Sequence, residues 1–175
     1  MKIRARGVEL VAGAERRSFE ELYRLHARDA RRLAYLLTGS REAADDLTQD
    51  AFIRAYGRLA HLRREDAFAP YLRRTVVNLA RMQFRRRAVE RRYLLRQREE
   101  QTAPDERDLT ETEGLRLALA RLPYRQRAAV VLRFYSDLPD EETAAILGCT
   151  SGTVRSLISR GVAALRETLG GEGRG

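Results

Sequence analysis

The stretch "LPDEETAAILGCTSGTVRSLISRG", residues 138–161, decides how the C-terminal part of this chain folds. Pro139 and the acidic residues after it favour a helix start, because proline fits the first turn and negative charge stabilises a helix N-terminus. Gly148 can end that helix in the left-handed conformation, and Thr150 or Ser151 can cap a second helix. The spacing therefore predicts two short helices joined by a tight glycine turn.

The two predicted helices have separate apolar and polar faces. Ala144 in the first helix and Val154 and Leu157 in the second have the spacing of buried positions in a helix-turn-helix, whose second helix enters the DNA major groove. The polar face offers hydrogen-bond donors to phosphates and base edges. Its candidate DNA-binding residues are Thr153, Arg155, Ser156, Ser159 and Arg160. A helical hairpin that meets only solvent is the alternative, and we favour DNA contact because the chain is basic.

The bulk composition narrows the class of protein. The 175 residues include 34 Lys plus Arg and 25 Asp plus Glu, a formal net charge of +9 that favours a polyanionic partner. A hydrophobic content of 43% is sufficient for ordinary cores and argues against disorder throughout. We find no apolar run of membrane-spanning length and no secretory leader, so we expect a cytoplasmic protein. One cysteine and two histidines cannot build a disulfide or a four-ligand zinc site.

The charge is distributed unevenly and suggests where domains meet. Residues 54–98 hold fourteen basic and three acidic side chains, whereas residues 99–115 hold one basic and seven acidic ones. The acidic segment contains Pro104 and almost no aliphatic residues, which is typical of a linker. The predicted fold is all-α, with two small helical domains joined by a flexible acidic linker. The predicted segments are a flexible N-terminus (1–17), a first domain (18–96), the linker (97–113), a helix-turn-helix domain (114–169) and a disordered tail (170–175).

The first domain opens with two helices that the sequence marks clearly. Ser18 and Glu21 form a capping box, and Gly39 ends the helix that they begin. That helix has an apolar stripe of Phe19, Leu22, Leu33, Leu36 and Leu37. The second helix is predicted over residues 40–59. Its expected buried residues are Ala44, Leu47, Ala51, Tyr56 and Leu59.

An acidic stripe runs along the second predicted helix. Glu42, Asp46 and Asp50 follow one another at four-residue steps, so they share a face where like charges repel. Three explanations are solubility, a metal site, or docking of a basic partner. A metal site is disfavoured, because no histidine or second acidic helix lies nearby in sequence. Solubility and docking remain open from the residues alone.

A third predicted helix, "FAPYLRRTVVNLARMQFRRRAVERRYLL", covers residues 68–95 and is strongly basic. It begins near Pro70, and we expect Leu72, Val76, Leu79 and Phe84 on its buried face. Tyr71, Asn78 and its arginines combine stacking, base-edge hydrogen bonding and phosphate neutralisation, which suits unpaired DNA. The candidate contacts are Tyr71, Arg74, Asn78, Arg81, Arg85, Arg86 and Arg87. A basic face that only increases solubility is the alternative.

In the order of these parts, residues 18–169 resemble an extracytoplasmic-function sigma factor of bacterial RNA polymerase, of the SigE-like type of actinobacteria. "DDLTQDAFIRAY" (45–56) looks like the helix of that family that docks on core polymerase. Residues 68–87 look like its minus-ten reader, and residues 122–167 look like its minus-thirty-five reader. The resemblance implies promoter DNA and core RNA polymerase as partners, with an anti-sigma factor as a further candidate. The polymerase contacts that it implies are Asp46, Gln49, Asp50 and Ile53.

The resemblance also implies a mechanism, promoter melting by capture of a flipped base in a loop that matches "HLRREDAFAP" (61–70). We expect no catalytic residue, no metal and no cofactor. A free-standing helix-turn-helix regulator is the alternative, but it calls for a ligand pocket or a dimerisation helix in the other domain. An enzyme such as a recombinase is disfavoured, because Tyr93 beside Arg91 and Arg92 is the only suggestive group and has no partner acid or base.

Overall fold

The computed structural model describes residues 18–59, 65–95 and 111–171. Within these ranges the chain is helical and contains no strand, which confirms the all-α prediction. The helices are α1 (Phe19–Thr38), α2 (Arg41–Leu59), α3 (Phe68–Leu95), α4 (Glu111–Arg121), α5 (Tyr124–Phe134), α6 (Asp140–Leu147) and α7 (Ser151–Gly171), with a short 3-10 helix η1 (Glu65–Ala67) before α3. None of these described helices combines the length and apolar composition needed to cross a membrane.

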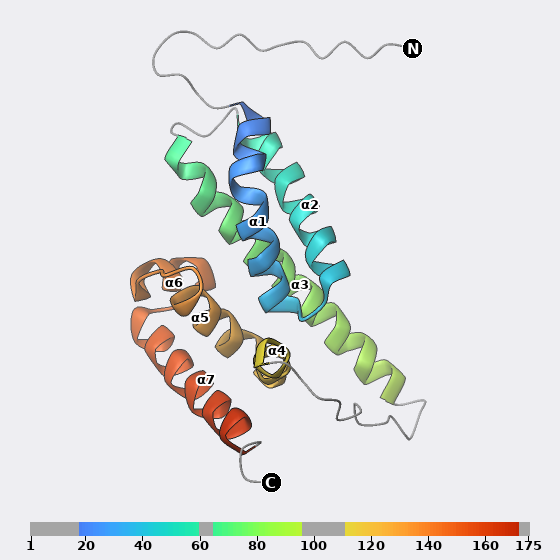
Figure 1. The fold of residues 1–175 in the computed structure, drawn as a ribbon, viewed down its shortest axis with the longest axis vertical. Coiled ribbons are helices and arrows are strands. Elements are labelled where there is room, and N and C mark those ends of the chain that lie inside the picture. The colour runs from blue at the N-terminus through green and yellow to red at the C-terminus, as the bar shows by residue number, and fades with distance from the viewer. Residues whose placement is uncertain (1–17, 60–64, 96–110, 172–175) are drawn as a thin grey trace.

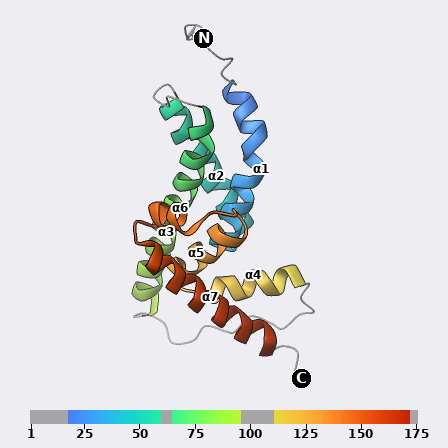
Figure 2. The same cartoon turned by 90° about the vertical axis from the view of Figure 1, so that its left-hand side faces the viewer.

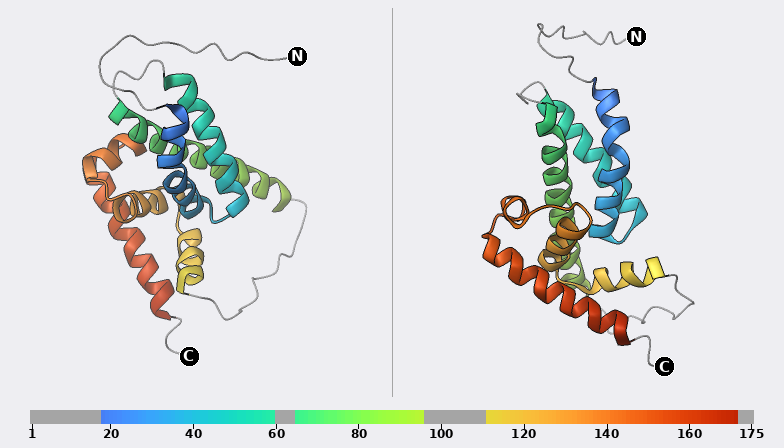
Figure 3. Two further views of the ribbon diagram at one scale, coloured as in Figure 1. Left: turned by 45° about the horizontal axis from the view of Figure 1, so that its top comes forward. Right: turned by 60° about the vertical axis from the view of Figure 1, so that its left-hand side comes forward.

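The helices form two groups. Helices α1, α2 and α3 lie side by side as a three-helix bundle, which we call the first helical unit (Figure 1). Helices α4 to α7 form the second helical unit, in which α7 packs on α4, α5 and α6. Figures 2 and 3 show the second unit against one end and one side of the bundle, where α4 and α5 contact α1 and α5 contacts α3. One hydrophobic core is continuous through both units.

The capping residues predicted for α1 are confirmed. The Ser18 Oγ accepts a hydrogen bond from the Glu21 N–H at 3.2 Å, and the Glu21 carboxylate accepts one from the Ser18 N–H at 2.6 Å. Gly39 ends the helix with a φ of 71°, a left-handed conformation that favours glycine. Both ends of α1 therefore follow from local sequence.

The helix-turn-helix is also confirmed, and the structure identifies its cap. Gly148 ends α6 with a φ of 63°, and the Thr150 Oγ1 accepts a hydrogen bond from the Thr153 N–H at 3.2 Å. Thr150, rather than Ser151, therefore caps the start of α7. Val154 is fully buried and Leu157 is 7% exposed, as expected for the core of this motif.

The predicted burial of Tyr56 is wrong. Its side chain is 62% exposed, whereas Phe52, one turn earlier on α2, is 3% exposed. Tyr56 lies beside the beginning of α1, where it meets the edge of the Phe19 ring with the centroids 4.8 Å apart. The described part of the bundle ends there, so too few of the described residues remain as neighbours to enclose the ring. The side chain of Leu59 lies outside the description.

Two predicted segment boundaries fall inside helices. Residues 1–17, 96–110 and 172–175 lie outside the described residues, but the last part of the predicted linker, Glu111 to Glu113, belongs to α4. Acidic side chains stabilise a helix N-terminus, so these residues fit a first turn as well as a linker. Gly170 and Gly171, placed in the tail, belong to α7. Glycine lowers helix stability by only about 1 kcal/mol and does not forbid it.

Gly161 allows close packing of α7 on α5 and gives a testable expectation. A Cβ at this position would lie 2.7 Å from the Val130 Cγ2, closer than real contacts allow. We expect Gly161→Ala to lower the free energy of unfolding by about 1 kcal/mol, because overpacking costs roughly 1–3 kcal/mol and better helix propensity returns about 1 kcal/mol. Chemical denaturation measures the change. Gly57→Ala on α2 is the matched control, because its Cβ would meet nothing within 4 Å, and we expect unchanged or higher stability. A stabilised Gly161→Ala variant would contradict the packing.

Candidate nucleic-acid and protein interfaces

The polar residues of the second helix of the helix-turn-helix gather on the solvent side of α7. Arg155, Ser156, Ser159 and Arg160 are exposed and Thr153 is half-buried. Val154 and Leu157 hold the opposite side of the helix in the core. The predicted DNA-binding residues are therefore accessible on one helix.

Local hydrogen bonds arrange this α7 face. The Ser156 Oγ donates to the Gly152 carbonyl at 3.1 Å, and the Arg160 Nε donates to the Ser156 carbonyl at 3.2 Å. The Arg155 Nε lies 3.4 Å from the Asp140 Oδ2, in the first turn of α6. This ion pair is weak, because the Arg155 side chain is 71% exposed. Asp140 can thus orient Arg155 without preventing its contact with a base, a role that the sequence analysis did not identify.

The predicted contacts on α3 form a stripe along the helix. Positions 71, 74, 78, 81 and 85 are separated by steps of three and four residues, so they share a face. Arg74, Asn78 and Arg85 are exposed, and Tyr71 and Arg81 are half-buried. Arg86 and Arg87 are also exposed and extend the positive charge at its end. From position 71 to position 87 the stripe is about 24 Å long at 1.5 Å per residue.

The acidic residues of α2 lie on the outside of the bundle. Asp46, Gln49, Asp50 and Ile53 are all exposed, and Ile53 is 62% exposed despite its apolar side chain. Gln49 and Ile53 also line an open groove of about 1070 Å³ between α1 and α2. Tyr23 and Tyr56, which are also exposed, line the same groove, and a contiguous exposed apolar surface of this kind is typical of a site that binds another protein.

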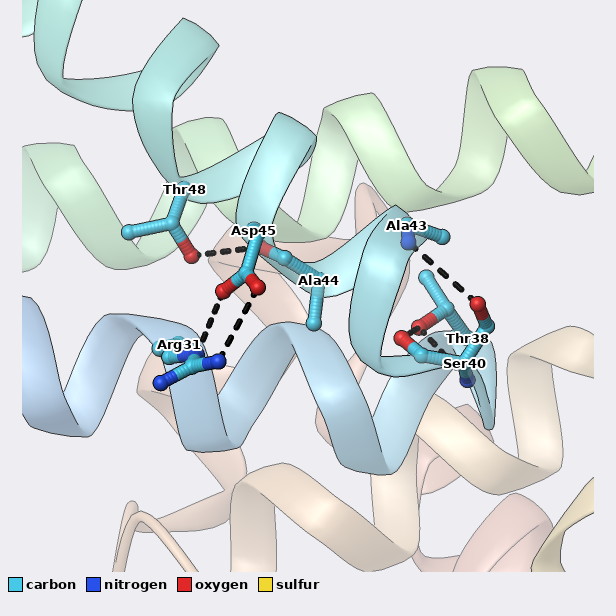
Figure 4. A network of polar contacts seen from close by, with 7 residues as sticks. All are labelled: Arg31, Thr38, Ser40, Ala43, Ala44, Asp45 and Thr48. Atoms are coloured by element: carbon cyan, nitrogen blue, oxygen red, sulfur yellow. Dashed lines mark hydrogen bonds and ion pairs between the residues drawn. The ribbon is translucent and has the colours of Figure 1, made fainter.

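Contacts at the turn between α1 and α2 hold this surface in place (Figure 4). The Arg31 Nη2 donates to the Asp45 Oδ2 at 2.9 Å, which ties α2 to α1. The Ser40 Oγ accepts from the Ala43 N–H at 3.3 Å and caps the start of α2. Asp45 is therefore paired within the bundle. Its neighbour Asp46 has no ion pair among the described residues, so its charge remains available to a partner.

Comparison with known proteins decides between the candidate classes. The model for sigma-70 region 2 matches residues 22–90, and the model for sigma-70 region 4 matches residues 112–165. The ECF RNA polymerase sigma factor SigM of Mycobacterium tuberculosis is 37% identical over 163 residues, which cover 91% of this chain and 81% of SigM. The chain belongs to the extracytoplasmic-function sigma factors. Members of this family are transcription initiation factors and not enzymes, which excludes the alternative of an enzyme such as a recombinase.

Two further relatives support this membership. The ECF sigma factor SigE of Mycolicibacterium smegmatis is 40% identical over 159 residues, which are 87% of this chain but 62% of SigE. The sigma-E factor of Streptomyces coelicolor is 34% identical and covers 86% of this chain and 85% of its own length. The predicted likeness to the actinobacterial SigE type is therefore confirmed.

Solved structures agree with the fold of this sigma factor. The sigma factor RpoE of Bartonella quintana, determined in complex with the anti-sigma factor NepR, matches 86% of this chain and 96% of RpoE, with a TM-score of 0.71 and 27% identity. CnrH, determined in complex with the cytosolic domain of CnrY, matches 87% of this chain and 88% of CnrH, with a TM-score of 0.63 and 25% identity. Both comparisons span the first and second helical units.

Proposed function

We propose that this sigma factor binds core RNA polymerase and recognises the two elements of a promoter with α3 and α7. After promoter binding it melts the DNA, so that transcription can start. The observation that supports this proposal best is that one chain presents an acidic outer face on α2 together with two separate cation-bearing polar faces. A regulator that acts alone has no use for the first of these surfaces. We place its work in the cytoplasm, where polymerase acts.

The acidic face of α2 is the proposed polymerase contact. Asp46 and Asp50 supply negative charge that favours binding to a basic surface of the polymerase. Ile53, which lines the α1–α2 groove, supplies an apolar contact beside them. Complementary charge gives speed and specificity of association, whereas buried apolar surface gives much of the affinity. Gln49 adds a hydrogen-bonding side chain on the same face.

The α3 stripe is the proposed minus-ten reader. Its Asn78 can hydrogen-bond a base edge, Tyr71 can stack on an unpaired base, and Arg74 can neutralise a phosphate. Unstacking a base costs a few kcal/mol, and stacking on an aromatic ring returns about 1–3 kcal/mol, so capture of a flipped base can drive melting. Of the loop that the resemblance assigns to this capture, residues 61–64 lie outside the described residues.

The exposed face of α7 is the proposed minus-thirty-five reader. Arg155 and Arg160 can contact guanine through its two major-groove acceptors, and Thr153, Ser156 and Ser159 can contact phosphates or other base edges. The complex of RpoE with the anti-sigma factor NepR supports a further proposal, that an anti-sigma factor restrains this chain as well.

The arginine cluster at positions 85–87 is expected to act on all promoters alike. Neutralising Arg85, Arg86 and Arg87 with glutamine should weaken holoenzyme binding and flatten the dependence of log affinity on log salt by about 0.7–0.9 for each lost phosphate contact. The measurement is affinity for matched and scrambled promoters across a salt series. Arg125→Gln, an exposed arginine on α5, serves as the control. An unchanged slope would show that the cluster does not contact phosphates.

The proposed function has a direct biochemical test. The purified protein is added to core RNA polymerase and a set of genomic promoter fragments, and transcripts are mapped at their start sites. We expect discrete starts that core polymerase alone does not give. Core polymerase that initiates at the same positions with and without the protein would contradict the proposal.

A further inference from the structure

Three exposed apolar side chains lie along the groove between α1 and α2, and we call them the apolar strip. Tyr23 is 47% exposed, and Ile53 and Tyr56 are each 62% exposed. The half-buried Phe19 and the buried Phe52 line the same groove beneath them. Every residue that lines the groove belongs to α1 or α2, so no other described element covers it. Apolar surface that is contiguous and exposed in this way marks a site of association.

The two sides of the groove carry opposite charges. On α1, Arg24 and Arg28 are exposed and form what we call the basic side. On α2, Asp46 and Asp50 are exposed and form the acidic side. Arg24 pairs with Glu20 one turn away, but this pair is weak, because the two side chains are 73% and 72% exposed. Most of the charge on both sides is therefore available to a partner.

The charges of the two sides lie at matching levels along the groove. Phe19 and Tyr56 meet at one end, with ring centroids 4.8 Å apart, and Arg31 pairs with Asp45 toward the other end (Figure 4). Helices α1 and α2 are therefore antiparallel, and both rise equally per residue. The pairs at about the same level are Arg28 with Asp46 and Arg24 with Asp50.

This surface is complementary to itself about a two-fold axis. An axis along the groove, parallel to the helices, places α1 of one copy over α2 of the other and keeps every residue at its level. The basic side of each copy then meets the acidic side of the other, and the two apolar strips meet in the centre. A two-fold axis across the groove places α1 on α1 instead, which brings the two basic sides together. Charge therefore selects the first arrangement, a bundle of four helices.

The size of the face indicates how strong such a dimer is. Helices α1 and α2 have 20 and 19 residues, so the face is about 30 Å long and, at about 10 Å per helix, about 20 Å wide. Two copies then bury about 1,200 Å² in total, the lower limit for a specific interface. We expect a dissociation constant in the micromolar range, with monomers at the nanomolar concentrations of DNA-binding experiments.

We propose that this sigma factor forms a two-fold dimer through its α1–α2 face, in which each copy covers the apolar strip of the other. The partner that fits this surface is a second copy of the chain. Asp46, Asp50 and Ile53 are also the proposed polymerase contacts, so the dimer and the polymerase complex exclude one another. This last consequence rests on the proposed function, whereas the dimer itself does not. The dimer is thus a reserve of sigma factor that polymerase draws on as monomer.

Sedimentation equilibrium of the full chain tests for the dimer. Between about 1 and 200 μM, a range that brackets a micromolar dissociation constant, we expect the mass to rise from one copy toward two. Ile53→Ser should weaken the dimer at least about ten-fold, because each dimer loses two apolar contacts. Leu25→Ser is the matched control, since Leu25 is 52% exposed on α1 but does not line the groove. A chain that stays monomeric throughout this range would overturn the proposal.

Charge reversal tests which sides meet. One variant combines Arg24→Glu with Arg28→Glu, and the other combines Asp46→Arg with Asp50→Arg. Each variant alone sets like charges against one another, so we expect its self-association to fall at least about ten-fold. An equal mixture restores opposite charges at every contact and should form a heterodimer about as strong as the unmodified dimer. Arg125→Glu, an exposed reversal on α5, is the control.

The outcomes of the mixing experiment separate the alternatives, provided that circular dichroism shows both variants to be helical. Variants that self-associate like the unmodified protein, or a mixture that stays monomeric, would overturn the proposed interface. Core polymerase added to the unmodified dimer should yield a complex with one copy of the sigma factor. A polymerase complex that retains the dimer would overturn the mutual exclusion. A chain that dimerises but never binds polymerase would instead overturn the proposed function and leave the dimer in place.

Discussion

Replacing Asp46 and Asp50 by arginine is expected to abolish binding to core RNA polymerase while leaving the protein folded. Both side chains are exposed on α2, and neither has an ion pair among the described residues that folding would lose. Against a basic partner surface, two attractive contacts become repulsive, which costs several kcal/mol and lowers affinity at least about 100-fold. Size-exclusion chromatography with core enzyme and circular dichroism measure the two parts of this expectation.

The control for this experiment is Glu167→Arg, an exposed acid on α7. It reverses a charge on the same chain but away from α2, so we expect polymerase binding to stay within about two-fold of the unmodified protein. If the Asp46 and Asp50 variant co-elutes with core enzyme as the unmodified protein does, α2 is not the docking surface. A loss of helical signal in that variant would show instead that these carboxylates support the fold.

Changing Arg155 to alanine is expected to remove sequence discrimination at the minus-thirty-five element. Arg155 is exposed on α7 and paired only weakly with Asp140, so its guanidinium can reach a base. Loss of a bidentate contact with guanine costs about 1–3 kcal/mol at the preferred sequence and much less at others. Affinity of the holoenzyme for matched and scrambled minus-thirty-five elements measures the difference.

Asp140→Ala provides the companion variant for Arg155. It removes the acidic partner but leaves the arginine, so we expect discrimination to fall less than in Arg155→Ala. Thr168 is a half-buried residue near the end of α7, the helix that carries Arg155, and its hydroxyl donates a hydrogen bond to the Ala164 carbonyl at 2.9 Å. As a control, Thr168→Ala should leave discrimination unchanged. Equal losses of affinity on matched and scrambled DNA in Arg155→Ala would contradict base reading by this residue.

The sequence predicted correctly those helix ends that depend only on residues close together in the chain. The capping box of Ser18 and Glu21 and the left-handed glycines at positions 39 and 148 depend on side chains within four residues of one another. Such contacts form wherever the chain is helical and need no partner from another element. The same reasoning could not choose between Thr150 and Ser151, because both hydroxyls lie within reach of the first turn of α7.

The contacts that sequence reasoning missed join residues far apart in the chain. Arg127 and Leu37 are separated by 90 positions, and Tyr124 and Val77 by 47. Helical periodicity places Arg127 on α5 but carries no information about which carbonyl lies opposite. One signal was present, the absence of a basic residue in the last turn of α1. It indicates that a cation is needed there but not which residue supplies it.

The error at Tyr56 has a similar origin. Tyr56 lies one turn after the buried Phe52, and both rings meet the Phe19 ring, so Tyr56 does face α1. Burial also depends on where the neighbouring helices begin and end, and α1 begins opposite Tyr56. The surface residues of α2, α3 and α7 were easier to predict, because a charged or hydrogen-bonding side chain on the polar side of an amphipathic helix faces solvent in almost any packing.

Footprinting of promoter DNA, with and without core polymerase, tests the central claim most directly. A sigma factor needs polymerase to hold its two readers on one promoter, whereas a free-standing helix-turn-helix regulator dimerises and protects a paired site alone. We predict no protection by the protein alone, and protection of both elements with permanganate-reactive, melted thymines near minus ten once core polymerase is added. Strong protection of a paired site by the protein alone, unchanged by polymerase, would contradict the account.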